Sequence, residues 1–156
     1  MIDFERLLRR LVDCEVNFIV VGGVAAAIHG SARLTQDLDV VYERTAPNIS
    51  RLVAAVADLS PYLRGAPPGL PFLFDAITIT RGLNFTLQTD AGALDLLGEI
   101  AGGGGFENLR DHSIQVSLFG VAIHCLDLDT LIHVKRAAGR PKDFETIAEL
   151  EALRDE

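Results

Sequence analysis

The sequence predicts an α/β protein in which helices pack on a mixed sheet, as one domain over residues 1–156. Two observations carry this prediction. Amphipathic helical segments alternate with short β-branched runs in the first half, and two hairpin signals followed by two helical segments make up the second. No internal repeat or domain linker interrupts this order, and 156 residues suffice for one hydrophobic core.

The first half alternates between helical and strand patterns. Apolar residues recur at helical spacing before Asp13, whereas Phe18 to Val21 is a continuous apolar run of the kind found in buried strands. Pro47 suits the first turn of a helix. The expected elements are a helix over 3–14, a strand over 18–21, a glycine turn at 22–23, a helix over 24–29, a strand over 37–42 and a helix over 47–59.

The second half is dominated by hairpins. Asp90-Ala91-Gly92 and Phe119-Gly120 each separate two strand-like runs. The segment over 73–80 fits either a short helix or a strand. The expected elements are a loop over 61–71, strands over 83–89 and 93–100, a loop over 101–105, a helical turn over 106–110, strands over 114–118 and 121–126, a helix from 127 to Gly139 and a last helix from Pro141 to Leu153.

Charge and composition exclude some classes of protein. The net charge of -8 argues against binding nucleic acid through a broad cationic surface, although it leaves room for a local nucleotide site. No apolar run is long enough for a membrane span, and the N-terminus does not resemble a signal peptide. Cys14 and Cys125 lie in apolar segments without metal-site spacing, which indicates buried thiols. We therefore expect a cytoplasmic protein with no membrane partner.

Three aspartates are the strongest candidates for chemistry. Asp37 and Asp39 occupy alternate positions of one expected strand, so both project from the same face, roughly 6.5–7 Å apart along the chain. Such a pair fits a Mg²⁺ site that also takes substrate phosphates, or merely a surface strand or strand cap. Asp95 has apolar neighbours, which fits either a semi-buried ligand and proton acceptor or an aspartate that faces water near the hairpin end.

Glycines and cations near these acids fit a phosphate site. Gly22 and Gly23 separate a strand from a helix, and the backbone N–H groups freed there can hold a phosphate, although such a turn is often only a turn. Both lysines of the chain, Lys135 and Lys142, fall in one short basic stretch. That stretch fits either a local patch for phosphates or favourable cations at a helix C-terminus.

The pattern Val21-Gly22-Gly23-Val24-Ala25, then His29-Gly30-Ser31, Arg33 and Thr35, then Asp37-Leu38-Asp39-Val40 and a later lone aspartate resembles the DNA polymerase beta-type nucleotidyltransferase superfamily. Within it the chain looks most like small AbiEii-type or MNT-type bacterial enzymes, many of which are toxins of toxin–antitoxin pairs. The C-terminal run from Leu131 to Asp143 also resembles theirs.

This resemblance implies a nucleotidyltransferase fold on a twisted mixed sheet, two Mg²⁺ ions and transfer of a nucleoside monophosphate from an NTP to a hydroxyl. It implies that Asp37, Asp39 and Asp95 are catalytic metal ligands, with Asp95 also activating the acceptor. It further implies that Gly22 and Gly23 hold the triphosphate.

The resemblance does not fix the roles of three other residues, and for these we offer our own hypotheses. We place Lys135 at the β- or γ-phosphate, Arg33 near the phosphate or acceptor entrance, and Thr35 with the nucleotide.

Several alternatives stay open from the sequence. The acceptor is expected to be RNA, such as tRNA, or a protein, with a cognate antitoxin as a possible partner. A small-molecule acceptor, such as an antibiotic, would use the same chemistry. The non-enzymatic alternative is a regulatory module that binds a nucleotide but does not catalyse a reaction. The presence of all three carboxylates favours an enzyme over this alternative.

Overall fold

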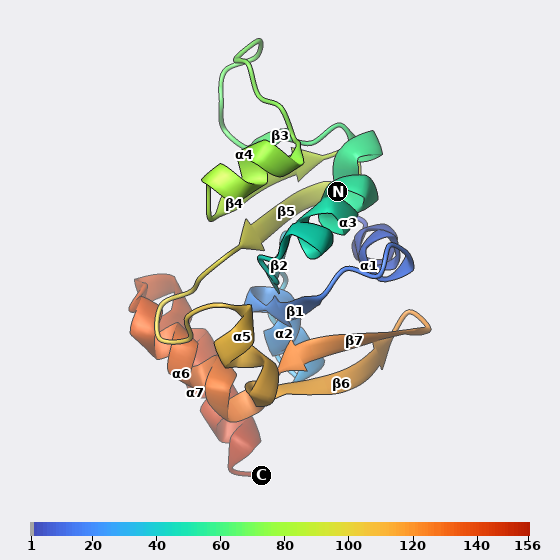
Figure 1. Cartoon of the computed structure of the whole chain (residues 1–156). Coiled ribbons are helices and arrows are strands. Elements are labelled where there is room, and N and C mark those ends of the chain that lie inside the picture. The colour runs from blue at the N-terminus through green and yellow to red at the C-terminus, as the bar shows by residue number, and fades with distance from the viewer. Residues whose placement is uncertain (1) are drawn as a thin grey trace.

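A computed structural model of the chain describes residues 2–156 (Figure 1). Its strands form one sheet in the order β3-β4-β5-β2-β1-β7-β6. Strand β1 runs parallel to β7, and β2 runs parallel to β5, whereas the other neighbours are antiparallel. The predicted class of helices packed on a mixed sheet is therefore confirmed.

The order of elements follows the sequence prediction, with one short strand added in the expected loop. The helices are α1 (Phe4–Asp13), α2 (Gly22–Ile28), α3 (Ala46–Val56), α4 (Ala76–Arg81), α5 (Phe106–Leu109), α6 (Leu128–Ala138) and α7 (Phe144–Arg154). The strands are β1 (Phe18–Val21), β2 (Asp37–Tyr42), β3 (Tyr62–Leu63), β4 (Phe85–Thr89), β5 (Gly92–Leu97), β6 (Ser113–Leu118) and β7 (Val121–Leu126).

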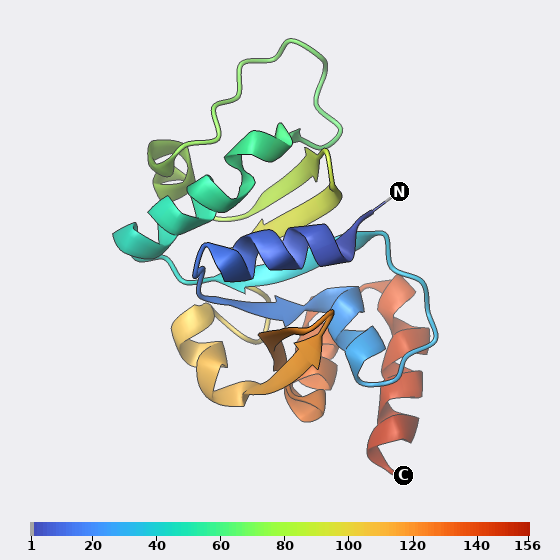
Figure 2. The same cartoon turned by 90° about the vertical axis from the view of Figure 1, so that its right-hand side faces the viewer.

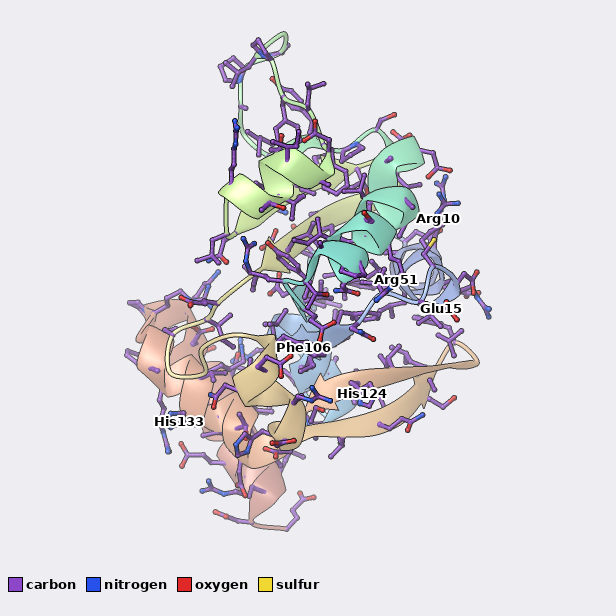
Figure 3. All side chains as sticks on the ribbon, viewed as in Figure 1. Arg10, Glu15, Arg51, Phe106, His124 and His133 are labelled. Carbon is purple, nitrogen blue, oxygen red and sulfur yellow. The ribbon has the colours of Figure 1, made fainter. Side chains whose placement is uncertain are left out.

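The helices form two groups around the sheet. Helices α1 and α3 lie side by side against one face, and α2, α6 and α7 cluster toward the other (Figures 1 and 2). Two arginines tie α1 to α3 (Figure 3): Arg10 donates to the carbonyl of Ala55 at 3.0 Å, and Arg51 donates to the carbonyl of Glu15 at 3.0 Å. Within residues 2–156, none of these helices is long and apolar enough to cross a membrane.

Strand β2 shows how the sheet separates core from site. Leu38 and Val40 are fully buried on one face, while Asp37 and Asp39 are half-buried on the opposite face. Because successive side chains of a strand point to opposite faces, the same alternation that builds the core also presents the two carboxylates together. The central position of β2 in the sheet then fixes both of them.

Element boundaries differ from the prediction at a few places. The expected glycine turn is instead the first two residues of α2, because Gly22 and Gly23 already belong to the helix. The segment over 73–80 resolves as α4, whose N-cap Asp75 accepts from the N–H of Thr78 at 2.8 Å. Strand β4 begins only at Phe85, and before it the N–H of Gly98 donates both to the carbonyl of Leu83 at 3.1 Å and to the side chain of Asn84 at 2.8 Å.

The two cysteines should differ sharply in reactivity. Cys125 is fully buried in β7, and this burial, together with the charge of Asp127, raises the pKa of its thiol to about 12. Cys14 is only half-buried. We expect iodoacetamide at pH 8 to label Cys14 in the native protein and Cys125 only on unfolding, because the thiolate is the reactive form. Peptide mass spectrometry would measure this, and equal labelling rates would contradict it.

Candidate active site

Asp37, Asp39 and Asp95 converge on one face of the sheet. Strand register brings them together, since Asp39 of β2 pairs directly with Asp95 of β5 and Asp37 lies two residues before Asp39. One carboxylate oxygen from each of the three lies within 4.8 Å of the others. All three side chains are half-buried. The acids singled out in the sequence thus form one cluster.

Burial and like charge make this cluster electrostatically costly. Burial is the main cause that raises the pKa of Asp39 from 3.8 to about 9, and contacts with Asp37 and then Asp95 raise it further. Burial also raises the pKa of Asp95, although its hydrogen bond with Arg64 opposes that rise. One oxygen of Asp39, Oδ1, is buried and finds no hydrogen-bond partner anywhere in residues 2–156.

These features fit a divalent cation. Hard ions such as Mg²⁺ prefer carboxylate oxygens, and a bound cation would offset both the like charges and the unpartnered Oδ1 atom. The cluster supplies only oxygen ligands, which is the donor set of Mg²⁺ rather than of zinc. Asp37, Asp39 and Asp95 are therefore the residues that could hold the ion.

Gly22 packs directly against the carboxylate of Asp39. The register of β1 with β2 places Val21 opposite Asp39, so the first residue of α2 arrives beside the cluster. Gly22 has φ +67°, and a Cβ at this position would lie 2.9 Å from Cγ of Asp39. Gly23 has a similar constraint, because a Cβ there would lie 2.9 Å from Cβ of Thr35. Only glycines allow the chain this approach.

Two cations border the cluster on the side of α6. A cavity of about 310 Å³ is lined by Gly22, Asp39, Asp95, Lys135 and Arg140, among others. Lys135 is 7% exposed, and its Nζ lies 3.6 Å from Asp143 Oδ1. Arg140 donates to the second oxygen of Asp143 at 2.7 Å. The structure therefore brings Lys135 to the cavity that is lined by Asp39 and Asp95, whereas Asp37 lines a different cavity.

The remaining predicted residues lie elsewhere around the site. Thr35 donates from Oγ1 to the carbonyl of Asp37 at 3.1 Å and lines a second, larger cavity of about 940 Å³ beside Asp37. Arg33 donates to Glu145 of α7 at 2.6 Å and lies 4.0 Å from Glu149. Arg33 is thus engaged with α7, and its role near the nucleotide stays a prediction.

Arg64 is a site residue that sequence reasoning missed. It follows β3, forms an ion pair with Asp95 and lines the 940 Å³ cavity. The N–H of Arg64 donates to Thr86 of β4 at 2.9 Å, which fixes the start of the loop against the sheet. The sequence offered one local signal for Arg64, which is that it is the single charged residue in the proline-rich stretch over 61–71.

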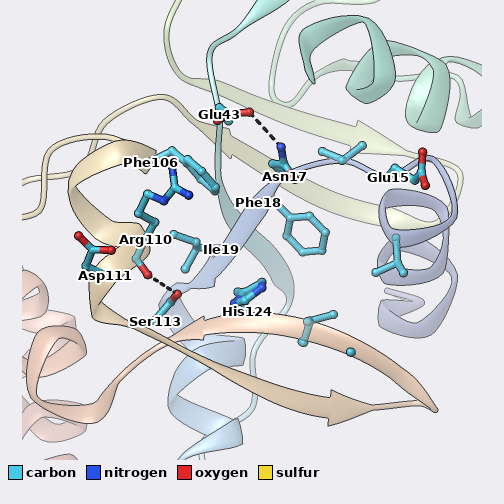
Figure 4. Close-up of a pocket in the computed structure, with 14 residues that line it drawn as sticks. Glu15, Asn17, Phe18, Ile19, Glu43, Phe106, Arg110, Asp111, Ser113 and His124 are labelled. Atoms are coloured by element: carbon cyan, nitrogen blue, oxygen red, sulfur yellow. Dashed lines mark hydrogen bonds between the residues drawn. The ribbon is translucent and has the colours of Figure 1, made fainter. Parts of the chain in front are cut away.

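A further cavity of about 560 Å³ lies at the opposite ends of β1 and β2 (Figure 4). Phe18, Glu43, Phe106, Arg110 and His124 are among its lining residues. The carboxylate cluster lies at the C-terminal end of β1 and the start of β2, whereas this cavity adjoins the start of β1 and the residue after β2. It is therefore separate from the candidate active site.

Comparison with known proteins shows likeness in structure rather than sequence. The sequence matches neither a protein-family profile nor a curated protein. LnuA, a lincosamide antibiotic adenylyltransferase solved with lincomycin bound, superposes with a TM-score of 0.65 at 13% identity, covering 97% of this chain and 98% of that one.

Two other solved structures align over nearly the whole chain. A candidate nucleotidyltransferase from Thermotoga maritima gives a TM-score of 0.60 at 19% identity, covering 96% of this chain and 94% of that chain. ANT(2'')-Ia in complex with adenylyl-2''-tobramycin gives 0.56 at 15% identity, covering 96% and 91%. Likeness at these identities establishes the fold, and this chain therefore has the nucleotidyltransferase fold.

Proposed function

We propose that this protein is a Mg²⁺-dependent nucleotidyltransferase, which moves a nucleoside monophosphate from an NTP to a hydroxyl acceptor. The observation that carries the proposal is the cluster of Asp37, Asp39 and Asp95, with its buried and unpartnered Asp39 Oδ1. Burying acidic groups and an unpartnered oxygen destabilises the fold, and proteins keep such features at functional sites where a bound ligand can offset the cost. The likeness in fold to LnuA, an antibiotic adenylyltransferase, and to ANT(2'')-Ia, an antibiotic-resistance factor solved with adenylyl-2''-tobramycin, supports the same class of reaction.

In the proposed reaction, the acceptor oxygen forms a bond to the α-phosphorus of the NTP, the bond from that phosphorus to the bridging oxygen breaks, and pyrophosphate leaves. Asp37 and Asp39 would hold two Mg²⁺ ions, with Asp95 as a further ligand to one of them. When bound, Mg²⁺ supplies positive charge that offsets the charge developing on the phosphoryl oxygens. Asp95 would also accept the proton of the acceptor hydroxyl, while Gly22 and Gly23 would contact the triphosphate through backbone N–H groups.

Lys135 is proposed to contact the β- or γ-phosphate. Replacing it by Met should raise the KM for NTP about 10–100-fold, because a hydrogen bond to a charged group contributes about 1.5–3 kcal/mol. Some stability should also be lost, because buried Asp143 keeps its bond to Arg140 but loses Lys135, and thermal unfolding checks that the variant is folded in the assay. Lys142→Met is the matched control, because this second lysine is exposed. Steady-state kinetics would measure both variants, and equal effects from both would contradict the assignment.

The acceptor has two candidate classes. The resemblance to AbiEii-type and MNT-type enzymes favours a macromolecular hydroxyl, on tRNA or on a protein. A small-molecule acceptor is favoured by the antibiotic substrates named for LnuA and ANT(2'')-Ia, and by the 940 Å³ cavity beside Asp37. The net charge of -8 further weighs against a large RNA surface.

The function is tested by incubating the protein with each labelled NTP, Mg²⁺ and one acceptor pool at a time. The pools are tRNA, cell protein, lincomycin and tobramycin. Label in one pool that depends on Asp37 is the expected result, and the labelled pool identifies the acceptor class. No label with any pool, and no difference from Asp37→Ala, would favour the nucleotide-binding module without turnover.

The toxin hypothesis has its own test. If the protein is the toxin of a toxin–antitoxin pair, induced expression should arrest bacterial growth, and Asp37→Ala should abolish the arrest. Co-expression of the neighbouring open reading frame should restore growth if that frame encodes the antitoxin. Unimpaired growth at high expression would contradict the toxin role. It would not bear on the transferase reaction, which the labelling assay tests separately.

A further inference from the structure

The outer strand β6 leaves one edge of the sheet open. It is the terminal strand beside β7 and has six residues, whereas β3 at the other edge has two. The hairpin of β6 and β7 extends from the sheet with β6 on its outer side (Figures 1 and 2). Open edges of this length pair readily with another strand unless they are guarded.

Ladder geometry shows which backbone groups face outward. The N–H of Asp127 donates to the carbonyl of His112 at 2.9 Å, and the register pairs Ile114 with Cys125 two residues further on. In an antiparallel pair, hydrogen-bonded positions alternate, so even-numbered residues of β6 bond to β7 and odd-numbered ones point outward. Gln115 and Ser117 are exposed, and their backbones have no hydrogen-bond partner beyond β7 in residues 2–156.

None of the usual guards against edge pairing is present in β6. The strand, Ser-Ile-Gln-Val-Ser-Leu, contains no charge and no proline, and its register with β7 runs without a bulge over all six pairs. Natural edge strands generally carry lysine, proline or a bulge to prevent association. The open edge of this chain is therefore competent to pair.

The turn that ends β6 provides an independent observation. Phe119 has φ +54° and Gly120 has φ +78°, as in a type I′ turn, where glycine and asparagine are the favoured residues. A bulky residue in this conformation is strained, yet Phe119 also leaves 41% of its surface exposed. Exposed Ile114, at 40%, adds a second apolar side chain to the same edge. Both the strained backbone of Phe119 and its exposed apolar side chain are explained if this hairpin contacts another molecule.

We propose that β6 pairs antiparallel with β6 of a second copy of this chain, which makes one continuous sheet across a two-fold axis. The edge is self-complementary when Val116 faces its own counterpart. Gln115 then exchanges backbone hydrogen bonds with Ser117 of the other copy, and Ile114 packs across from Leu118. Apolar side chains thereby meet on one face, and neutral polar side chains meet on the other.

Charges at the two ends of the edge agree with this register. Arg9 donates through Nε to Glu5 at 3.0 Å and through Nη2 to the carbonyl of Phe119, so its guanidinium lies at the turn, whereas Asp111 precedes the strand at its other end. Antiparallel pairing brings the turn of one copy to the strand start of the other, so Arg9 approaches the opposite charge of Asp111 twice. Two six-residue edges form a small interface, and we expect a dimer that dissociates on dilution.

A charge pattern placed on Gln115 and Ser117 tests both the dimer and its register. Both side chains are exposed, so substitution should leave the fold intact, which thermal unfolding checks. Sedimentation equilibrium of the full chain should show wild type approaching twice the monomer mass as concentration rises. Gln115→Lys with Ser117→Lys should remain monomeric, because four lysines would then meet across the axis.

The matched variant is Gln115→Lys with Ser117→Glu. In the proposed register each lysine faces a glutamate of the other copy, so this variant should dimerise at least as tightly as wild type. A wild type that stays monomeric at high concentration overturns the proposal. A Lys–Lys variant that dimerises like wild type, or a Lys–Glu variant as monomeric as Lys–Lys, overturns the register.

Discussion

Asp39→Asn is expected to slow nucleotidyl transfer severely and yet make the metal-free protein more stable. The substitution removes an acid that the native cluster keeps protonated at pH 8, at a cost in stability because the unfolded state releases this proton. It also supplies an amide in place of a carboxylate with a buried, unpartnered oxygen. In EDTA at pH 8 we expect the free energy of unfolding to rise by about 1–3 kcal/mol, which is the cost of an unsatisfied buried polar group.

The same substitution should lower the rate of transfer by about 10²–10³-fold, because it removes a metal ligand and the electrostatic stabilisation that depends on it. Urea unfolding and the labelling assay measure the two effects separately. Asp90→Asn is the control, since that carboxylate is exposed in the turn between β4 and β5. Loss of stability in Asp39→Asn, or retained activity, would contradict a metal site that includes Asp39.

The stability gain should depend on pH. The pKa of Asp39 is raised from 3.8 to about 9, mainly by burial, so between these values the native state holds a proton that the unfolded state has released. Stability from this group is therefore complete below about pH 3.8 and declines as pH rises toward 9. Asp39→Asn should flatten this decline in EDTA, and parallel profiles for the two proteins would show that Asp39 does not cause it.

Gly22→Ala is expected to cost both stability and activity. The left-handed conformation at φ +67° costs a non-glycine residue about 1–2 kcal/mol, and the new Cβ would also displace the carboxylate of Asp39. We expect a loss of more than 2 kcal/mol in unfolding free energy, and a loss of transfer comparable with that of Asp39→Asn.

Gly69→Ala separates these two causes. Gly69 has φ +84°, but a Cβ there would meet nothing within 4 Å. It should therefore show the conformational cost alone and keep its activity. Urea unfolding and transfer assays measure both variants, and equal losses of activity would mean that the contact between Gly22 and Asp39 is not important for the reaction.

The sequence was sufficient for features that depend on local pattern. Alternation in Asp37-Leu38-Asp39-Val40 placed both acids on one face, and the hairpin signal around Gly92 placed Asp95 within a strand. It could not show that β2 and β5 are parallel neighbours, which is what brings Asp39 beside Asp95. The cluster was therefore inferred from family resemblance, and its geometry came from long-range pairing.

The features that sequence reasoning missed all depend on tertiary contacts. Strand β3 has two residues, too few for any periodicity, and Arg64 reaches Asp95 only because β3 pairs with β4. The β-branched residues Ile77, Thr78 and Ile79 obscured α4, which is held by its Asp75 cap and by Arg44 donating to the carbonyls of Ile79 and Thr80. Burial of Lys135 against Asp143 likewise follows from the packing of α6 on α7.

The central claim is that Asp37, Asp39 and Asp95 hold divalent cations together with an NTP. Calorimetry with a non-hydrolysable NTP analogue tests it most directly, in Mg²⁺ and in EDTA, for wild type and Asp39→Asn. We expect Mg²⁺ to tighten binding at least about tenfold in wild type, and both EDTA and Asp39→Asn to remove that gain. Binding that is indifferent to Mg²⁺ and to the loss of Asp39 would contradict the proposed metal-dependent site.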